Sequence, residues 1–225
     1  MERVKDKLNR LSVRASKQRG QNFLIDQTVL DEIVRFGSAT ENDRLVEIGP
    51  GLGALTARLQ PHSSLSVVEI EPRFCEELAQ KYPALHIVNE DVRKVDFSRF
   101  GSDLVVFGNL PYSFSTEIIF HLISQRTVIN RAVLMLQREF AERLAACPGG
   151  RDYGVITVMT RLWADFVLGA VVPGTSFHPP ARVESRILQM SFRREPRVNI
   201  SDPEWFRRVV QAAFSQRRRT LYNSL

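Results

Sequence analysis

Short apolar runs alternate with helix-like segments through the middle of this 225-residue chain. The predicted strands cover residues 45–48, 65–70, 86–89, 104–107 and 132–136. Helices are expected around 54–59, from Pro72 onward, and over 118–123 and 139–145. Proline is favoured at the first position of a helix, which makes Pro72 a helix start. Strand and helix in repetition predict a mostly parallel sheet covered on both faces, a doubly wound α/β fold.

The pattern changes after Pro148-Gly149-Gly150. A helical piece over 155–163 precedes two β-rich runs, 166–172 and 187–192, which a proline-rich turn separates. Strands without a helix between them predict an antiparallel pair that closes one edge of the sheet. Beyond Asp202, one face of a further helix is predicted to collect Phe206, Val209, Val210, Ala213 and Phe214.

Two basic ends flank a mildly acidic body. Residues 1–19 hold seven Lys or Arg against two acids, and residues 193–225 hold eight against three. Each end is therefore +5, and because the whole chain is +6, the part between them is −4. This asymmetry favours a polyanion, nucleic acid before membrane, although solvated tails at both ends are the alternative. No apolar run is long enough to span a membrane.

The cysteines and histidines carry no metal-ligand spacing. Cys75 and Cys147 are the two cysteines, far apart, and the four histidines are scattered. We expect no metal site and a reducing, cytoplasmic compartment.

A glycine-rich turn, Glu47–Gly53, follows the first predicted strand. Gly49 and Gly51 let the backbone turn sharply and approach a ligand closely. Glu69 comes eighteen residues after Gly51 at the end of the second strand, where a carboxylate can accept hydrogen bonds from a ribose, and Asp91 follows the third, where it can meet an adenine amine. Ligands of open α/β sheets bind outside the carboxyl ends of the strands. A dinucleotide is one alternative, but S-adenosylmethionine, with a ribose and an adenine and no phosphate, uses every acid named here.

The turn Asn109-Leu110-Pro111-Tyr112 follows the fourth strand. Pro111 favours extended backbone at Leu110, which displays the Leu110 carbonyl. The Asn109 amide supplies a second acceptor, and Tyr112 supplies an aromatic face. Together they can grip an exocyclic amine while a ring stacks on the base; the alternative is an ordinary proline-containing loop.

These motifs, taken in order, resemble those of the ribosomal RNA adenine N6-dimethyltransferases, which are class I methyltransferases with a Rossmann-like sheet. The resemblance runs nearly end to end and rests on 20–24, 47–53, 68–71, 89–91, 108–112 with Ser115-Thr116, 137–141, 177–185 and 214–221. It implies S-adenosylmethionine as cofactor and dimethylation of small-subunit ribosomal RNA, within an immature subunit, by a monomer.

The resemblance also implies residue roles. Asn22 and Leu24 would close over the cofactor, Gly49 and Gly51 would line it, and Glu69, Asp91 and Asn109 would bind it. Asn109 and Leu110 would take the target N6 amine, with Tyr112 and Phe177 sandwiching the base. RNA contacts are expected from Lys17, Arg19, Arg217, Arg218 and Arg219.

The expected organisation is a basic arm over 1–19, a methyltransferase domain over 20–192 and part of a C-terminal helical RNA-docking segment over 193–225. Ala181, Arg182 and Glu184 replace a Pro, a Lys and an Asp common in the family. Two other functions stay open: a large-subunit adenine methyltransferase that confers macrolide resistance, and a ribosome-assembly binding factor with secondary methylation. Leu110 favours the small-subunit enzyme, since the resistance enzymes often carry Ile there.

Overall fold

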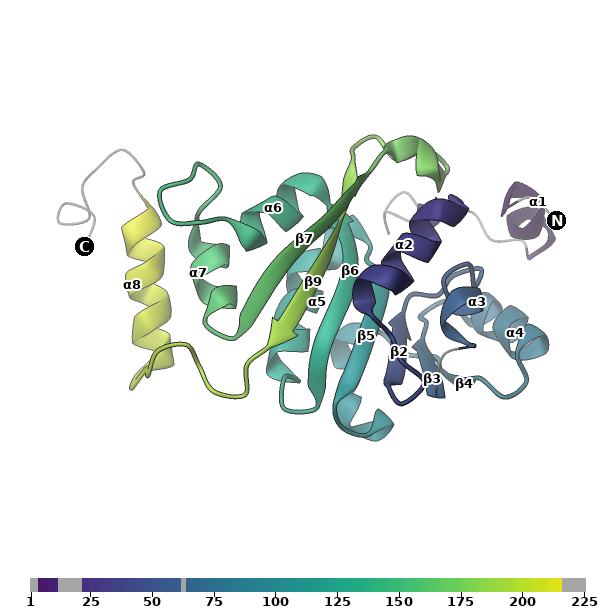
Figure 1. The fold of residues 1–225 in the computed structure, drawn as a ribbon, viewed down its shortest axis with the longest axis horizontal. Helices are drawn as coiled ribbons and strands as arrows, with labels where there is room; N and C mark the ends of the chain where they lie inside the picture. The colour runs from purple at the N-terminus through teal and green to yellow at the C-terminus, as the bar shows by residue number, and fades with distance from the viewer. Residues whose placement is uncertain (1–3, 12–21, 62–63, 216–225) are drawn as a thin grey trace.

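The computed structural model describes residues 4–11, 22–61 and 64–215. Within these, a seven-stranded sheet has the order β4-β3-β2-β5-β6-β9-β7 (Figure 1). The strands are β2 (Arg44–Ile48), β3 (Ser64–Val68), β4 (His86–Val88), β5 (Leu104–Asn109), β6 (Ile129–Gln137), β7 (Ala164–Val172) and β9 (Ser185–Phe192). The five strands from β4 to β6 run parallel, and β9 is antiparallel to both β6 and β7. The predicted fold class, with its antiparallel edge, is confirmed.

The helices surround this sheet, with α2 in front, α5 behind, and α1 and α8 at opposite ends of the molecule (Figure 1). They are α1 (Val4–Arg10), α2 (Gln27–Gly37), α3 (Thr56–Leu59), α4 (Pro72–Lys81), α5 (Ser115–Ser124), α6 (Arg138–Ala145), α7 (Val155–Arg161) and α8 (Pro203–Ser215). A separate two-stranded ladder pairs β1 (Phe23–Leu24) with β8 (Phe177–His178). The sequence analysis did not predict α1, α2 or this ladder.

Some predicted boundaries move. The helix expected over 54–59 starts at Thr56, because the turn with left-handed glycines continues through Gly53 (φ 77°). The second strand ends at Val68 instead of residue 70, because the backbone turns there toward α4. The strand expected from 166 starts at Ala164, directly after α7 ends at Arg161.

Neighbouring residues of the central strands enter two different cores. Val46 and Val106 pack with α5 residues such as Ile119, whereas Leu45 and Val105 pack on the other face among α2 residues. Side chains of a strand alternate between its two faces, so a strand covered on both faces is apolar throughout. This explains why the apolar runs of β2 and β5 are continuous in the sequence. They pack the sheet between two layers of helices.

The strand order reverses at β2. The chain moves outward from β2 to β3 and β4, and then returns to place β5 on the other side of β2. The loops that leave β2 and β5 consequently separate in opposite directions and open a crevice at the carboxyl ends of these two strands. Both glycine-rich and Asn-Leu-Pro-Tyr turns begin at this crevice.

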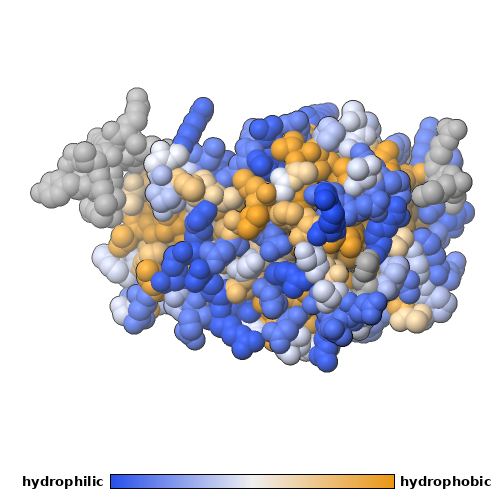
Figure 2. Space-filling model, viewed as in Figure 1, coloured by the Kyte–Doolittle hydropathy of each residue, from blue (hydrophilic) through white to orange (hydrophobic). Residues whose placement is uncertain are grey.

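The antiparallel edge ends the sheet on the opposite side from β4. Apolar side chains gather on the face of Figure 2 where β7 runs and beside α8. Val167 of β7 and Trp205 of α8 are 54% and 58% exposed. Helix α8 turns its predicted apolar face inward: Val210 is buried, and the Phe214 ring lies 5.8 Å from that of Tyr153. No helix among the described residues is long and apolar enough to cross a membrane.

Candidate active site

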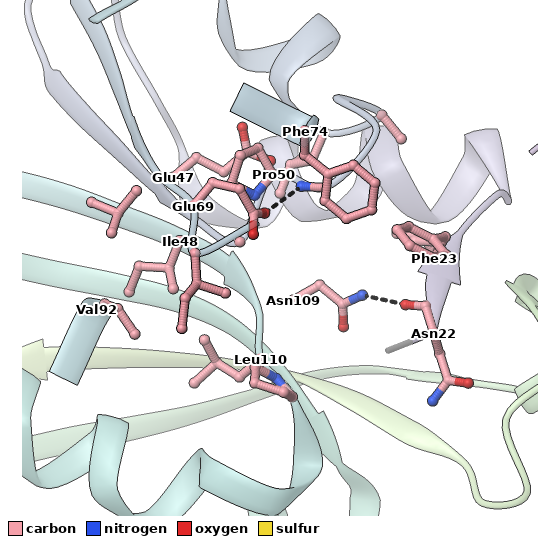
Figure 3. A pocket seen from close by; sticks show the side chains of 18 of the residues that line it. Asn22, Phe23, Glu47, Ile48, Pro50, Glu69, Phe74, Val92, Asn109 and Leu110 are labelled. Carbon is pink, nitrogen blue, oxygen red and sulfur yellow. Dashed lines mark hydrogen bonds between the residues drawn. The ribbon is translucent and has the colours of Figure 1, made fainter. Parts of the chain in front are cut away.

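A cavity of about 310 Å³ lies in the crevice at the carboxyl ends of β2, β3 and β5 (Figure 3). Its walls come from the glycine-rich turn, from Glu69 and Asp91, and from the turn at 109–112. The segment 22–24 lines it from the N-terminal side. The cofactor residues expected from the sequence, far apart in the chain, are thus brought together at one cavity.

The glycine-rich turn depends on left-handed backbone. Gly49 and Gly51 have φ of 64° and 53°, which a residue with a side chain adopts only at a cost. The Gly49 N–H donates to the Val68 carbonyl at 2.9 Å, which joins the turn to β3. A Cβ on Gly51 would lie 3.1 Å from the Phe23 ring, a contact tighter than ordinary packing. Phe23 therefore lies directly over this turn.

Glu69 connects the two loops that follow β2 and β3. Its side chain is buried, and one carboxylate oxygen accepts the Gly51 N–H at 3.1 Å while the other accepts the Glu71 N–H at 2.9 Å. Burial raises the pKa of this carboxyl, and the two backbone donors oppose that rise. A carboxylate fixed in this way at the cavity wall can accept further hydrogen bonds from a ligand's hydroxyls.

Glu47 is a second buried acid at the cavity, and the sequence analysis gave it no individual role. It is 2% exposed and accepts a hydrogen bond from Thr56 Oγ1 at 2.6 Å. Burial raises its pKa to about 8, and the negative charge of Glu69 adds to the rise. Glu47 is therefore mostly protonated at pH 7. It fastens the start of α3 to the end of β2, beneath the glycine-rich turn.

The surroundings of Asp91 favour its charged form, unlike those of Glu47. It caps the short 3₁₀ helix Val92–Lys94 by accepting the Arg93 N–H at 3.0 Å. The Arg93 guanidinium also binds both oxygens, with the Nε atom 3.0 and 3.1 Å away, and this hydrogen bonding lowers the pKa of the carboxyl. Arg93 lies 4.4 Å from the Phe114 ring centroid. Asp91 thus stays ionised and faces the cavity between Val92 and the β3 side.

Asn109 is oriented from the N-terminal segment. Its Nδ2 donates to the Asn22 carbonyl at 3.0 Å (Figure 3). Because the amide nitrogen is engaged there, its oxygen is the atom left to face the cavity as an acceptor. Asn22 and Asn109, predicted separately, therefore meet and determine which end of the amide is available.

The rest of the Asn-Leu-Pro-Tyr turn is held by the strands behind it. The Leu110 N–H donates to the Met135 carbonyl at 3.2 Å, and its side chain is buried. The Tyr112 hydroxyl lies 2.7 Å from Ser185 Oγ, and burial raises the pKa of this phenol. Leu110 and Tyr112 both line the cavity. The turn is a constrained wall of the cavity.

Phe177 lies elsewhere. It is 1% exposed, pairs with Leu24 in the small ladder, and packs in the core cluster on the α2 face. It is not among the residues that line the cavity. In this arrangement the ring has to be uncovered before it can stack on a base, so its role stays a prediction.

Helix α1 adds a part of the site that the sequence analysis missed. Val4 lines the cavity, and Leu8 packs with Leu52 and Phe74. Arg10 pairs with Glu77 at 2.7 Å and fixes the helix to α4. The apolar spacing Val4, Leu8, Leu11 was the available signal for a helix here. The predicted RNA contacts Lys17, Arg19 and Arg217–Arg219 lie outside the described residues.

The donor set fits an adenosine-containing sulfonium cofactor. Two carboxylates at the ends of successive strands match the ribose and the adenine amine, and apolar walls at Ile70, Phe74 and Val92 match the flat faces of a base. Among the described residues, Arg93 is the one lysine or arginine that lines the cavity, and it is bound to Asp91. A pyrophosphate would find carboxylates there instead of cations. Within the described residues, no cluster of His, Cys, Asp or Glu could hold a metal.

Known proteins are similar to this chain in sequence and in fold. The family model for ribosomal RNA adenine dimethylase matches residues 13–225. "Ribosomal RNA small subunit methyltransferase A" of Syntrophotalea carbinolica is 41% identical over 216 residues, which cover 94% of this chain and 82% of that protein. The protein of the same name in Nitrosomonas europaea is 42% identical over 211 residues, 93% of this chain and 82% of that protein.

Solved structures agree with the sequence matches. A dimethyladenosine transferase from Plasmodium falciparum has a TM-score of 0.79 at 30% identity, covering 90% of this chain and 74% of that one. The 23S rRNA methyltransferase ErmE has a TM-score of 0.76 at 26% identity, covering 90% and 83%. The structure and the sequence point to the same group of proteins.

Proposed function

The chain belongs to the ribosomal RNA adenine dimethylase family, and from that premise we propose that it methylates N6 of adjacent loop adenines in small-subunit ribosomal RNA with S-adenosylmethionine. The observation that carries the proposal is the hydrogen bond of the Asn109 amide nitrogen to the Asn22 carbonyl, which leaves the amide oxygen of this cavity-lining residue available as an acceptor. The nearness of relatives named as small-subunit methyltransferases supports the choice of RNA.

Several residues would hold the cofactor, which supplies a methyl group on a positively charged sulfur. Glu69 would accept hydrogen bonds from the ribose and Asp91 from the adenine amine. Gly49 and Gly51 would let the main chain approach, while Asn22 and Leu24 would close the N-terminal side. The Asn109 backbone lies at the same wall, with its carbonyl 4.0 Å from the position of a Cβ on Gly49. This closeness supports a cofactor wall next to the turn that would bind the amine.

The protein's part in the reaction is positioning. An adenine N6 amine is a weak nucleophile because its lone pair is delocalised into the ring. Hydrogen bonds from its two N–H groups to Asn109 Oδ1 and the Leu110 carbonyl would favour a pyramidal nitrogen whose lone pair is aimed at the cofactor side. Good orientation of reacting groups supplies roughly 7–11 kcal/mol in favourable cases. No basic side chain is needed for the attack, since the extra proton can leave to water afterwards.

The base must leave its stack to reach Asn109. This costs a few kcal/mol and is cheaper in a loop than in a duplex. The Tyr112 ring would offset part of that cost by stacking on the extruded base, and Phe177 would do so once uncovered. The basic ends, with Lys17, Arg19 and Arg217–Arg219, would bind phosphates.

The likeness to ErmE supports one second candidate, methylation of large-subunit RNA. The experiment that separates the two is transfer of radiolabelled methyl groups to immature small subunits, mature small subunits and naked large-subunit RNA, with the modified adenines mapped. We expect two adjacent small-subunit adenines to be labelled, in immature particles above all. Labelling confined to large-subunit RNA would replace the proposal with the second candidate, and no labelling of any adenine would leave a binding role in assembly.

A further inference from the structure

Tyr112 is held by a hydroxyl group that comes from the antiparallel edge of the sheet. Its Oη lies 2.7 Å from Ser185 Oγ. Ser185 is fully buried at the first position of β9, beside Gln137 of β6 and Val172 of β7. Ser185 itself does not line the cavity, whereas Tyr112 does. The serine can therefore affect a bound base only through the tyrosine.

The main chain around Tyr112 is fixed by other contacts. The Leu110 N–H binds the Met135 carbonyl at 3.2 Å, and the Pro111 carbonyl accepts from the Phe114 N–H and from Ser115 Oγ, both at 3.1 Å. With the backbone constrained, rotation about the side-chain torsions is the freedom that remains to the tyrosine. The contact with Ser185 holds the Oη end of the side chain, so the direction of the ring's long axis is set by the position of one buried oxygen.

The main chain around Ser185 is held in place by its neighbours. The residue before it, Glu184, accepts the Arg138 N–H on its carbonyl at 2.9 Å, and its carboxylate binds the Arg138 guanidinium at 2.7 Å. The residue after it, Arg186, binds Glu142 of α6 at 2.6 Å. Contacts to α6 thus hold the residues on both sides of Ser185, in addition to its strand ladders. Glu184, one of the departures from the family pattern, keeps its carboxylate in this network.

We infer that Ser185 is a positioning residue for methyl transfer: its hydroxyl holds the Oη end of the Tyr112 ring, and the ring so placed stacks on the target adenine and brings N6 to Asn109. The inference rests on the proposed function, because it assigns the adenine to Tyr112. A purely structural hydrogen bond, which only satisfies a half-buried phenol, would affect stability and leave the catalytic rate unchanged.

The test compares Ser185→Ala, Tyr112→Phe and the double variant in the full chain. Ser191→Ala is the matched control, a serine on the same strand whose neighbours are Arg131 and Asp165. The measurements are kcat and KM for ribosomal RNA, the Kd of S-adenosylmethionine, the melting temperature, and fluorescence quenching of 2-aminopurine placed at the target adenine. Losing one oriented hydrogen bond should lower kcat by about tenfold, with both KM and Kd within about twofold, and should weaken the quenching.

The double variant should be no slower than either single one, because both substitutions remove the same contact. Ser185→Ala with the kcat and quenching of Ser191→Ala would overturn the inference alone. If Ser185→Ala does not fold, Tyr112→Phe decides, since it removes the same bond and leaves β9 intact; a wild-type kcat there overturns the inference. Failure of the proposed function is seen separately, in an unsubstituted enzyme that labels no ribosomal adenine, and it removes the inference as well.

Discussion

The two walls of the cavity are built from different chemistry. The wall from β2 and β3 carries the buried acids Glu47 and Glu69, whose pKa values burial raises. The wall from the end of β5 and the turn after it carries an amide, a backbone carbonyl and a phenol, held by hydrogen bonds of 3.0 and 2.7 Å at Asn109 and Tyr112. The first wall selects a ligand by charge and hydrogen-bond acceptance, and it can respond to pH. The second wall can orient a bound group, and its amide, carbonyl and phenol stay uncharged from acid to mildly alkaline pH.

Asn109→Ala should separate the two walls most sharply. Removing the acceptor aimed at N6 is expected to lower methyl transfer by on the order of 10³-fold or more, because positioning supplies most of the rate. Cofactor affinity should stay within about tenfold, or about 1.4 kcal/mol. The measurements are single-turnover transfer and calorimetric titration of the cofactor.

Asn89→Ala is the matched control for Asn109→Ala. The Asn89 amide donates to the Glu69 carbonyl at 2.8 Å on the other wall. We expect that variant to weaken cofactor binding and to keep the kcat at saturating cofactor. Transfer retained by Asn109→Ala would show that the amide does not hold the target amine.

Gly51→Ala should damage the acidic wall instead. A side chain at φ 53° costs about 1–2 kcal/mol, and the added Cβ would press on the Phe23 ring at 3.1 Å. We expect cofactor affinity to fall by roughly tenfold or more, measured by titration. Gly149→Ala is the control, since Gly149 also has a left-handed φ of 86° but no atom within 4 Å of its added Cβ. Equal cofactor affinities in the two variants would contradict a close ligand approach at Gly51.

Charge reversal at Arg217, Arg218 and Arg219 should leave both walls intact and weaken only RNA docking. We expect the KM for RNA to rise by about tenfold and the dependence of binding on salt to flatten, because fewer counterions are released. The cofactor Kd should not change. Arg35→Glu, on the exposed side of α2, controls for net charge. An unchanged salt slope would show that the three arginines are structural.

The expected effect furthest from catalysis is on stability, through Glu47. Its pKa is raised from 4.5 to about 8, so the folded protein holds this proton more tightly than the unfolded chain. The stabilisation is therefore complete below pH 4.5 and is lost as pH rises through about 8. Glu47→Gln should flatten the fall of unfolding free energy across this window by up to about 1 kcal/mol per pH unit, measured by urea titration at several pH values.

Glu77→Gln is the opposite control for Glu47. Hydrogen bonding to Arg10 lowers the pKa of Glu77, so its contribution is present above the usual pKa and is lost as pH falls. The two variants should change the slope in opposite directions. Glu69 keeps its own share of the alkaline effect, because burial raises its pKa as well. Identical slopes in wild type and Glu47→Gln would mean that Glu47 is ionised in the folded protein.

The sheet could be predicted from sequence because its central strands bury local apolar runs. Residues 104–107 and 132–136 are continuous runs, and both became central parallel strands. Helix α2 was also within reach: Leu30, Ile33 and Gly37 lie on one buried face, after an Asp26 cap that accepts the Thr28 N–H. The β1–β8 ladder was not, because two-residue strands show no periodicity.

The same limit applies within the site. The spacing of glycines and acids pointed to Gly51 and Glu69, which are joined in the structure by a 3.1 Å hydrogen bond. The contact of Tyr112 with Ser185 spans 73 residues and leaves no local pattern. Nor did the sequence show that Phe177 is covered, since burial of a ring depends on which loop lies over it.

The hydrogen bond between Ser176 and Asp26 joins residues 150 apart in the chain. It can form only after most of the chain has been synthesised. The glycine-rich turn, Glu69 and Asp91 belong to consecutive strand and helix units and need only the first half of the chain. The small ladder beside Asn22 and the serine behind Tyr112 wait for residues beyond 170. The residues of the acidic wall are therefore synthesised well before the residues that pack against Asn22 and Tyr112.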